Sequence, residues 1–466
     1  MTATLTVENI TLPVAPIGPP NPLPLVVPVD LGIYEPDGSL PPEVETNMRF
    51  GRVANVFPYL RQDNYTRARE LAPVNVAVLE NPHLRATFAL GYGGRLLSLV
   101  QKQTDNELLF RNPVMQPANL ALRNAWIAGG VEWNIGVRGH SPHTSSPTYA
   151  GLVRTEHLGD VLRLWEYERI RRVVYQIDFA LAPHDPMLVW RTRIRNVTNR
   201  STAMYWWTNI AVPEKGTRVF APANTGIRTS YDGRLERVDL TTNGYTRPSE
   251  SRFAADLFYE SESDRPWIAA IDEQGTGVAH VSSRELFGRK LFVWGGTRAG
   301  DQWNRWLATE RAGRYAEIQA GLTTTQYEHL PMAPRAEWTW TEALAPVRTV
   351  PAAGSSDWAT AVSAVAQDVE RQLPAASIES IARSFRIHED DDPVLLASGS
   401  TWFHAERLAA SGTDRPPRLA GTPFTDAPDA ETQYWHDLAT GLHITPDTRT
   451  APASYVAGDH WLELLQ

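Results

Sequence analysis

The chain has 466 residues, no cysteine, a formal net charge of −9 and 21% charged residues. The lack of cysteine excludes disulfides and thiol chemistry, and an acidic balance without a basic block excludes the electrostatic footprint of a nucleic-acid-binding protein. The N-terminus lacks a charged and then apolar leader, and no stretch approaches the roughly 18 apolar residues of a membrane span. We therefore expect a cytoplasmic protein that has no membrane partner.

The N-terminal segment predicts an extended arm. Residues 4–12 alternate between polar and apolar side chains, and a proline-rich run follows from Pro13 to Pro28. Proline at this density excludes a helix or a central strand, so we expect the run to lie over a domain. A free linker also fits this composition. We assign residues 1–73 to a proline-rich arm with strands that pack on the core.

Residues 74–346 predict one large β domain. Short segments rich in β-branched and aromatic residues are separated by turn residues, with no helical period between them, which is typical of a sandwich. The expected strands include 74–79, 84–90, 162–167, 173–179, 188–194 and 291–294.

Residues 347–466 predict a small α-rich region. Apolar residues recur at helical spacing in 359–373, and the pattern ends before Pro374. Segments 378–381, 402–408 and 461–465 are also expected to be helical.

The strand predicted at 315–322 carries a polar face. Glu317 and Gln319 lie on one side of the alternation, while Ala316, Ile318 and Ala320 lie on the other. A carboxylate and an amide on one face can point into a cleft, and Glu328 follows shortly after. An ordinary exposed strand carboxylate is the alternative.

A second polar cluster lies in residues 124–143. It contains Gly129-Gly130, which allow a backbone turn or close approach that other residues would resist. His140 and His143 resemble a metal pair but lack a third ligand, so we expect no metal and no other cofactor. We prefer the interpretation that one histidine donates to a substrate oxygen or acts as an acid or base. The alternative is that both are loop residues whose ring nitrogens are hydrogen-bonded within the protein. The other candidates here are Glu132, Trp133 and Asn134.

Two further segments interleave indoles with polar groups. Trp207 and Asn209 share one face of the strand expected at 205–213, and residues 300–307 contain Asp301, Trp303 and Arg305. Aromatic rings that stack on C–H faces, together with polar groups that bind hydroxyls, are typical of a site for a neutral polyol. For Asp301 and Arg305, a surface ion pair is the alternative.

Several of these segments resemble motifs of the galactose mutarotase-like (aldose 1-epimerase-like) superfamily. Residues 93–98, with Arg95, resemble its early glycine turn, and Gly129-Gly130 followed by His140 resembles its glycine-glycine and histidine-glycine loop. Residues 196–209 resemble its Asn-x-(Ser/Thr) turn and the next strand. Residues 316–319 resemble the segment that carries the epimerase base.

A bacterial family of mutarotase-like domains, often followed by tetratricopeptide repeats, resembles still more of the chain. The shared segments are 12–18, 126–134, 206–212 and 302–305, and the match covers most of 1–346. The resemblance implies a mainly β fold, a β-supersandwich with an N-terminal extended arm and a small α-rich C-terminal region. It also implies a carbohydrate site on the concave face.

The sequence departs from the epimerase pattern at one strand. Where the family places a histidine, residues 208–210 are Thr, Asn and Ile, none of which is a general acid near neutral pH. The resemblance therefore implies a base at Glu317 with altered acid machinery. We expect a glycoside hydrolase that cleaves an oligosaccharide, with Glu132 or Asp301 as the partner of Glu317 and with His140 assisting.

The expected substrate-binding residues are Arg95, Trp133, Asn134, His143, Trp207, Asn209, Trp303, Arg305, Gln319 and Glu328. One alternative is an aldose 1-epimerase that uses Glu317 and His140. Another is a carbohydrate-binding module without turnover. Whether the chain forms a homo-oligomer is left open.

Overall fold

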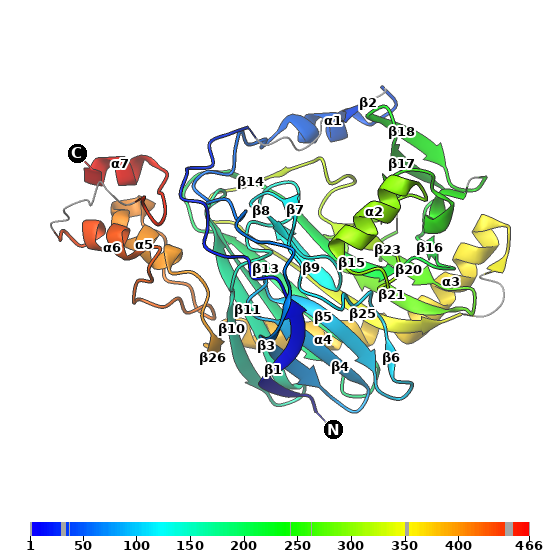
Figure 1. Cartoon of the computed structure of the whole chain (residues 1–466). Helices are drawn as coiled ribbons and strands as arrows, with labels where there is room; N and C mark the ends of the chain where they lie inside the picture. Colours follow the sequence, from blue (N-terminus) through cyan, green and yellow to red (C-terminus); the bar gives the residue numbers. More distant parts are fainter. Residues whose placement is uncertain are drawn as a thin grey trace.

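Two large β-sheets form the body of the protein, and helices lie around them (Figure 1). The structure is a computed structural model that describes residues 2–28, 34–36, 38–242, 244–261, 263–349, 354–442 and 451–465. Parts of the predicted arm and of the predicted α-rich region, at 29–33, 37, 350–353 and 443–450, lie outside the described residues.

The first sheet has 13 strands, which follow the order β1-β3-β4-β5-β9-β15-β23-β22-β19-β17-β18-β2, with β6 beside β5. Its pairs are antiparallel except for β18 with β2, which are parallel. The bounds are β1 Thr4–Val14, β2 Glu35–Pro36, β3 Glu70–Glu80, β4 Leu84–Ala89, β5 Arg95–Gln101, β6 Asn106–Glu107, β9 Val131–Ile135, β15 Trp206–Pro213, β17 Thr225–Thr229, β18 Arg234–Asp239, β19 Ala255–Tyr259, β22 Gly288–Val293 and β23 Tyr315–Gly321.

The second sheet has nine strands in the order β16-β20-β21-β25-β13-β12-β11-β10-β26. Its bounds are β10 Tyr149–Thr155, β11 Gly159–Glu168, β12 Val173–Leu181, β13 Leu188–Asn196, β16 Arg218–Phe220, β20 Trp267–Ile271, β21 Thr276–Ser282, β25 Glu337–Arg348 and β26 Val394–Ala397. Two small sheets pair β7 (Ala118–Ala121) with β8 (Asn124–Trp126), and β14 (Thr202–Met204) with β24 (Leu330–Met332).

Residues from both large sheets form one hydrophobic core. Ile210 and Ile318 of the first sheet belong to the same buried cluster as Phe179, Trp190 and Trp340 of the second. Because alternate residues of a strand point to opposite faces, the other faces of β9, β15 and β23 are free to carry polar side chains.

The helices are α1 Pro42–Arg49, α2 Arg298–Leu307, α3 Trp358–Gln372, α4 Ala375–His388, α5 Trp402–Ala409, α6 Gln433–Ala439 and α7 Asp459–Leu465. The sequence predicts α3, α4, α5 and α7 but neither α1 nor α2. α3 begins after Asp357, whose side chain accepts a hydrogen bond from the backbone N–H of Thr360, which is a standard helix cap. Among the described residues, no helix is long and apolar enough to cross a membrane.

The α-rich region has two parts. α3 and α4 bury Val365, Val369 and Phe385 in the core of the sandwich. α5, α6 and α7 instead gather at one side of the molecule, opposite α3 (Figure 1). The region that follows the β domain in sequence therefore begins as part of the same packed body.

The N-terminal arm is fixed by a long strand pair. β1 pairs with β3 in antiparallel register from Thr4 opposite Glu80 to Val14 opposite Glu70. Within the proline-rich run, the Asn64 side-chain amide donates to the carbonyl of Pro19. Strand β1 and the contact at Pro19 thus hold the described part of the arm against the body.

Arg163 ties the C-terminal segment to the second sheet. Its side chain is fully buried and forms a bidentate pair with Asp178, at 2.6 and 2.9 Å. The same guanidinium donates to the carbonyls of His388, Asp391 and Gly421, at 2.7 to 2.9 Å. A rigid planar donor set of this kind suits several acceptors at once.

We expect Arg163→Met to lower the free energy of unfolding by about 3–5 kcal/mol, since it leaves Asp178 buried without its counter-ion. Urea denaturation measures this loss. The control is Arg85→Met, because the Arg85–Glu8 pair is exposed and should contribute less than about 1 kcal/mol. Equal losses in the two variants would contradict the role assigned to Arg163.

Candidate functional site

A strip of polar side chains crosses the face of the first sheet that points away from the core. In the strand register, Asn209 of β15 lies opposite both Glu132 of β9 and Gln319 of β23. Lys290 of β22 lies opposite Gln319, and Glu317 projects to the same side one alternation along β23. We call these five residues the polar face. Adjacent antiparallel strands thus bring together side chains that are distant in the sequence.

Glu132 is a buried carboxylate with four polar partners, and only 4% of its surface is exposed. It accepts hydrogen bonds from Trp126 Nε1 at 2.9 Å and Thr144 Oγ1 at 2.7 Å. Arg95 Nη2 lies 3.2 Å away and His140 Nδ1 3.1 Å away. Burial alone would raise the pKa of Glu132, but the charges of His140 and Arg95 and the hydrogen bonds hold it well below its usual range. Glu132 is therefore ionised at neutral pH.

His140 is oriented by this carboxylate. Because ionised Glu132 only accepts hydrogen bonds, Nδ1 of His140 carries the proton. The ring packs against Trp126 at a centroid distance of 4.5 Å, and 21% of the side chain is exposed. This geometry leaves Nε2 as the nitrogen that can exchange a proton with a ligand.

The glycine pair before β9 is required for this arrangement. Gly130 has a φ of +70°, and a Cβ there would lie 2.1 Å from the carbonyl oxygen of Leu96. Arg95 Nη1 donates to the carbonyl of Gly129 at 2.8 Å. The tight turn therefore brings Arg95 and Glu132 into contact.

Glu317 is the second carboxylate on the polar face. Gln319 Nε2 donates to its Oε2 at 2.8 Å, and Asn209 Nδ2 lies 3.4 Å from the same oxygen. Burial, with a smaller contribution from Glu132, raises the pKa of Glu317, while His140 and Lys290 act in the opposite direction. A buried carboxylate with a raised pKa is a stronger base than an exposed one.

Unpartnered polar atoms lie on the same face of β15 and β23 as Glu317. Trp207 Nε1, Asn209 Oδ1 and Gln319 Oε1 are buried and have no hydrogen-bond partner in the described part of the chain. Trp207 packs directly over Gly321, where a Cβ would come within 2.2 Å of the indole. One fixed donor next to fixed acceptors matches a ligand group that both donates and accepts, as a hydroxyl does.

Three predicted binding residues have other positions. Trp133 points into the core, where its ring contacts Phe88 and Phe179, because it alternates with Glu132 along β9. This placement corrects the expected role of Trp133 in stacking on a ligand. Asn134 holds the following loop in place, since its Oδ1 accepts a hydrogen bond from the backbone N–H of Ser141 at 2.7 Å. His143 contacts Tyr59 and Tyr175 and does not lie on the polar face.

The predicted cluster at 300–307 forms the amphipathic helix α2. Asp301 pairs with Arg314, not with Arg305, which is exposed. Trp303 stacks on Trp294 at 5.9 Å and is partly exposed. Only Trp303 therefore packs against the same cluster as Trp126 and Phe292, next to the polar face.

Glu328 lies at the junction with α1. It accepts from the backbone N–H of Thr325 at 2.7 Å and from Asn47 Nδ2 of α1 at 3.3 Å. Burial raises the pKa of Glu328 to about 7. The side chain thus joins α1 to the segment between β23 and β24.

Sequence reasoning missed several residues of the site. Lys290 and Asp256 form an ion pair at 2.7 Å on neighbouring strands β22 and β19. Trp126 and Thr144 both bind Glu132. The alternation of β22 could have placed Lys290, whereas the contacts of Trp126, at the end of β8, and of Thr144, in the loop at 140–147, depend on a chain path that no local pattern predicts.

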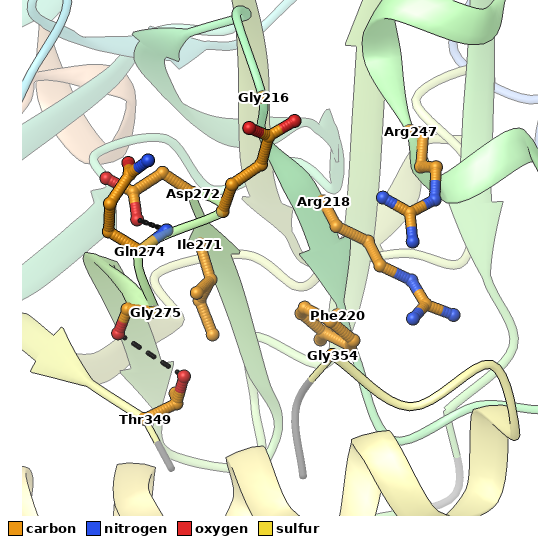
Figure 2. A pocket seen from close by; sticks show the side chains of 11 residues that line it. Gly216, Arg218, Phe220, Arg247, Ile271, Asp272, Gln274, Gly275, Thr349 and Gly354 are labelled. Atoms are coloured by element: carbon orange, nitrogen blue, oxygen red, sulfur yellow. Dashed lines mark hydrogen bonds between the residues drawn. The ribbon is translucent and has the colours of Figure 1, made fainter. Parts of the chain in front are cut away.

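A cavity of about 490 Å³ lies elsewhere, beside β16 and β20. Figure 2 shows the guanidinium groups of Arg218 and Arg247 next to Phe220 in this cavity, with Asp272 and Gln274 on the other side. None of the residues predicted from the sequence lines it. Within the described ranges, no group of three or more His, Asp or Glu side chains could hold a metal ion.

A family model matches residues 51–347, and its description is a domain of unknown function, DUF5107. Among solved structures, a TPR-domain-containing protein from Parabacteroides distasonis has a TM-score of 0.61 at 20% identity, over 74% of this chain and 56% of that one. The chain thus spans little more than half the length of that protein.

Two smaller solved proteins also match. A galactose mutarotase-like protein from Clostridium acetobutylicum has a TM-score of 0.45 at 9% identity, over 59% of this chain and 96% of that one. A galactose mutarotase related enzyme from Lactobacillus acidophilus has a TM-score of 0.39 at 10% identity, over 58% of this chain and 97% of that one. The predicted architecture, a mainly β sandwich of two large sheets with a small α-rich C-terminal region, is confirmed.

The environment of Glu328 predicts a pH-dependent stability. The folded protein keeps the Glu328 carboxyl protonated up to its pKa of about 7, whereas the unfolded chain releases that proton near 4.5. The folded state therefore binds the extra proton between these values, so this stabilisation is complete below pH 4.5 and is lost as the pH rises through 7.

We expect Glu328→Gln to resemble the wild type at pH 5 and to be more stable by roughly 3 kcal/mol at pH 8, since the amide stays neutral. Denaturant unfolding at both pH values measures the difference. Glu70→Gln, at an exposed position, is the matched control. A gain that is the same at pH 5 and pH 8 would rule out titration of Glu328 as its cause.

Proposed function

The chain belongs to the DUF5107 family, and we propose that it is a carbohydrate-active enzyme that transfers protons at the anomeric centre of a sugar, as an aldose 1-epimerase does. The observation that carries this proposal is the contrast between two carboxylates on one sheet face. Glu132 is held ionised and fixes His140, while Glu317 is buried with a raised pKa. Two titratable groups whose environments shift their pKa values in opposite directions are suited to acid and base roles.

In this proposal Glu317 is the base and His140 is the acid. The Glu317 carboxylate removes the proton of the anomeric hydroxyl while His140 Nε2–H donates a proton to the ring oxygen. The bond between C1 and the ring oxygen breaks, which gives an open-chain aldehyde. Rotation about C1–C2 and ring closure with both protons returned give the other anomer.

The other members of the polar face have supporting roles. Glu132 is a positioning residue that keeps the proton of His140 on Nδ1 and stabilises the imidazolium form. Gln319 and Asn209 orient Glu317 through their amide N–H groups. The free acceptors of these amides and Trp207 Nε1 are available to the remaining hydroxyls of the sugar.

Glycoside hydrolysis is the second candidate. It requires one protonated carboxyl group at the leaving oxygen and one free carboxylate that acts on water or on the anomeric carbon. Glu317, whose pKa is raised, suits the first role. Both oxygens of Glu132 are already bonded to its four partners, and Asp301 is paired with Arg314 on α2, so neither is free for the second role. These contacts are the reason that we place the epimerase first. The partly exposed indole of Trp303 beside the site would suit the longer substrate of a hydrolase.

Polarimetry of freshly dissolved α-D-glucose and α-D-galactose tests the epimerase. We expect the protein to accelerate the approach to anomeric equilibrium, and Glu317→Gln to lower the rate about 10²- to 10⁴-fold, the usual contribution of a general base. Glu70→Gln, which alters an exposed carboxylate, should keep the full rate. If the folded wild type does not accelerate mutarotation of any aldose, the epimerase assignment fails.

A panel of α- and β-linked oligosaccharides, analysed by chromatography, separates the second candidate from the first. We expect no released sugar, because the oxygens of Glu132, the other carboxylate of the polar face, are already bonded to four partners. Products that disappear in Glu317→Gln would instead establish a glycoside hydrolase. Calorimetric binding without turnover in either assay would indicate a carbohydrate-binding module.

A further inference from the structure

A second cavity, of about 370 Å³, lies at the seam between the arm, the loop at 140–147 and the C-terminal segment. We call it the seam cavity. It lies in the size range of small-molecule sites. Its walls include Gln62 from the arm, Arg123 and Arg169 from the β domain, and Trp402 and Glu431 from the C-terminal segment.

Two guanidinium groups are fixed in the wall of the seam cavity. Arg123 Nε donates to the carbonyl of Leu60 at 2.8 Å, and Arg169 stacks over the ring of Trp402 at 3.5 Å. Both arginines are buried, and burial lowers their pKa values, while the charge of Glu431 acts in the opposite direction on both. With Asp429 also in the wall, two acidic side chains balance the two cations.

Three buried polar atoms of the lining side chains have no partner among the described residues. They are the acceptor Gln62 Oε1 and the donors Arg169 Nε and Trp402 Nε1. Gln62 and Arg169 are each 8% exposed and Trp402 is 2% exposed, so bulk water does not satisfy these atoms freely. Buried polar groups are rarely left in this state without a ligand or bound water.

We propose that the seam cavity binds a neutral polyol of monosaccharide size. A hydroxyl both donates and accepts, so a polyol satisfies the free acceptor of Gln62 and the free donors of Arg169 and Trp402 together. The balanced charge of the wall favours a ligand without net charge, because a carboxylate or an ammonium group would meet a like charge on one side. This inference does not depend on the function proposed for the polar face.

The two sites lie on opposite sides of one loop. His140 faces the polar face, whereas the ring of His143 lines the seam cavity and its Nε2 lies 3.2 Å from the hydroxyl of Tyr59. Burial and the charges of Arg123 and Arg169 lower the pKa of His143 to about 3, so it is neutral there. Thr144, between them in the loop, donates to Glu132.

Isothermal titration calorimetry of the full chain with D-glucose, D-galactose, D-mannose and myo-inositol tests the proposal. Two variants alter the seam cavity. Ser398→Tyr adds a ring at an exposed wall position, and Glu431→Gln removes one charged acceptor. Glu463→Gln, on exposed α7, is the control, and Glu317→Gln reports binding at the polar face.

We expect at least one polyol to bind, with a Kd that rises more than tenfold in Ser398→Tyr and about tenfold in Glu431→Gln, the effect of one lost charge-assisted hydrogen bond. The Kd should be unchanged in Glu463→Gln and in Glu317→Gln. Thermal unfolding shows whether each variant is folded. If Ser398→Tyr does not fold, Glu431→Gln alone tests the seam cavity.

Three results would overturn the proposal. The first is that no polyol binds to the folded protein. The second is that binding is unaffected by both seam variants, or is lost in Glu317→Gln, which would place the ligand on the polar face. The third is that zwitterionic glycine or L-glutamate binds at the seam in place of every polyol.

Discussion

The site depends on the pairing of β15 with β9 on one side and β23 on the other. This register places Asn209 between Glu132 and Gln319 and buries Ile210 and Ile318 on the opposite face. A slip of one residue in either pair would bring the polar residues into the core and the apolar ones to the surface. The hydrophobic core therefore fixes the positions of the polar face, although the core residues themselves lie on the opposite side of the sheet.

Electrostatics then separates the two carboxylates that the register brings near each other. Glu132 has a guanidinium, an imidazole, an indole N–H and a hydroxyl as partners, so its burial as an anion is compensated. Glu317 has amide partners, and Lys290, whose charge favours the ionised form, is itself paired with Asp256. Because the compensation is unequal, one carboxylate serves as a fixed charge and the other can bind and release a proton.

The sequence predicts much of the architecture because the strands keep a period of two. The alternation in 316–320 correctly places Glu317 and Gln319 on one face of β23. The same rule, applied to β9, would have separated Trp133 from Glu132, but the loop-like composition of 124–143 obscured the strand. The residues near 300 were misleading for another reason, since α2 turns Asp301 toward Arg314 and leaves Arg305 in solvent.

The remaining parts of the site come from contacts between distant segments, which local patterns do not encode. Lys290 and Asp256 are 34 positions apart and meet only because β22 pairs with β19. Helix α1 contacts Glu328 through Asn47 and packs Val44 and Met48 in the same cluster as Trp207. No sequence period in 42–49 predicts that contact, so it follows from the fold alone.

Unsatisfied polar atoms occur at both sites, as they also do elsewhere in the described part of the chain, for example at Trp133 and His329. On the polar face they belong to Trp207, Asn209 and Gln319, and at the seam to Gln62, Arg169 and Trp402. A buried polar atom without a partner lowers stability by about 1–3 kcal/mol. What distinguishes the two sets is that each combines fixed donors with fixed acceptors, which is the pattern that the proposed hydroxyl-bearing ligands would satisfy.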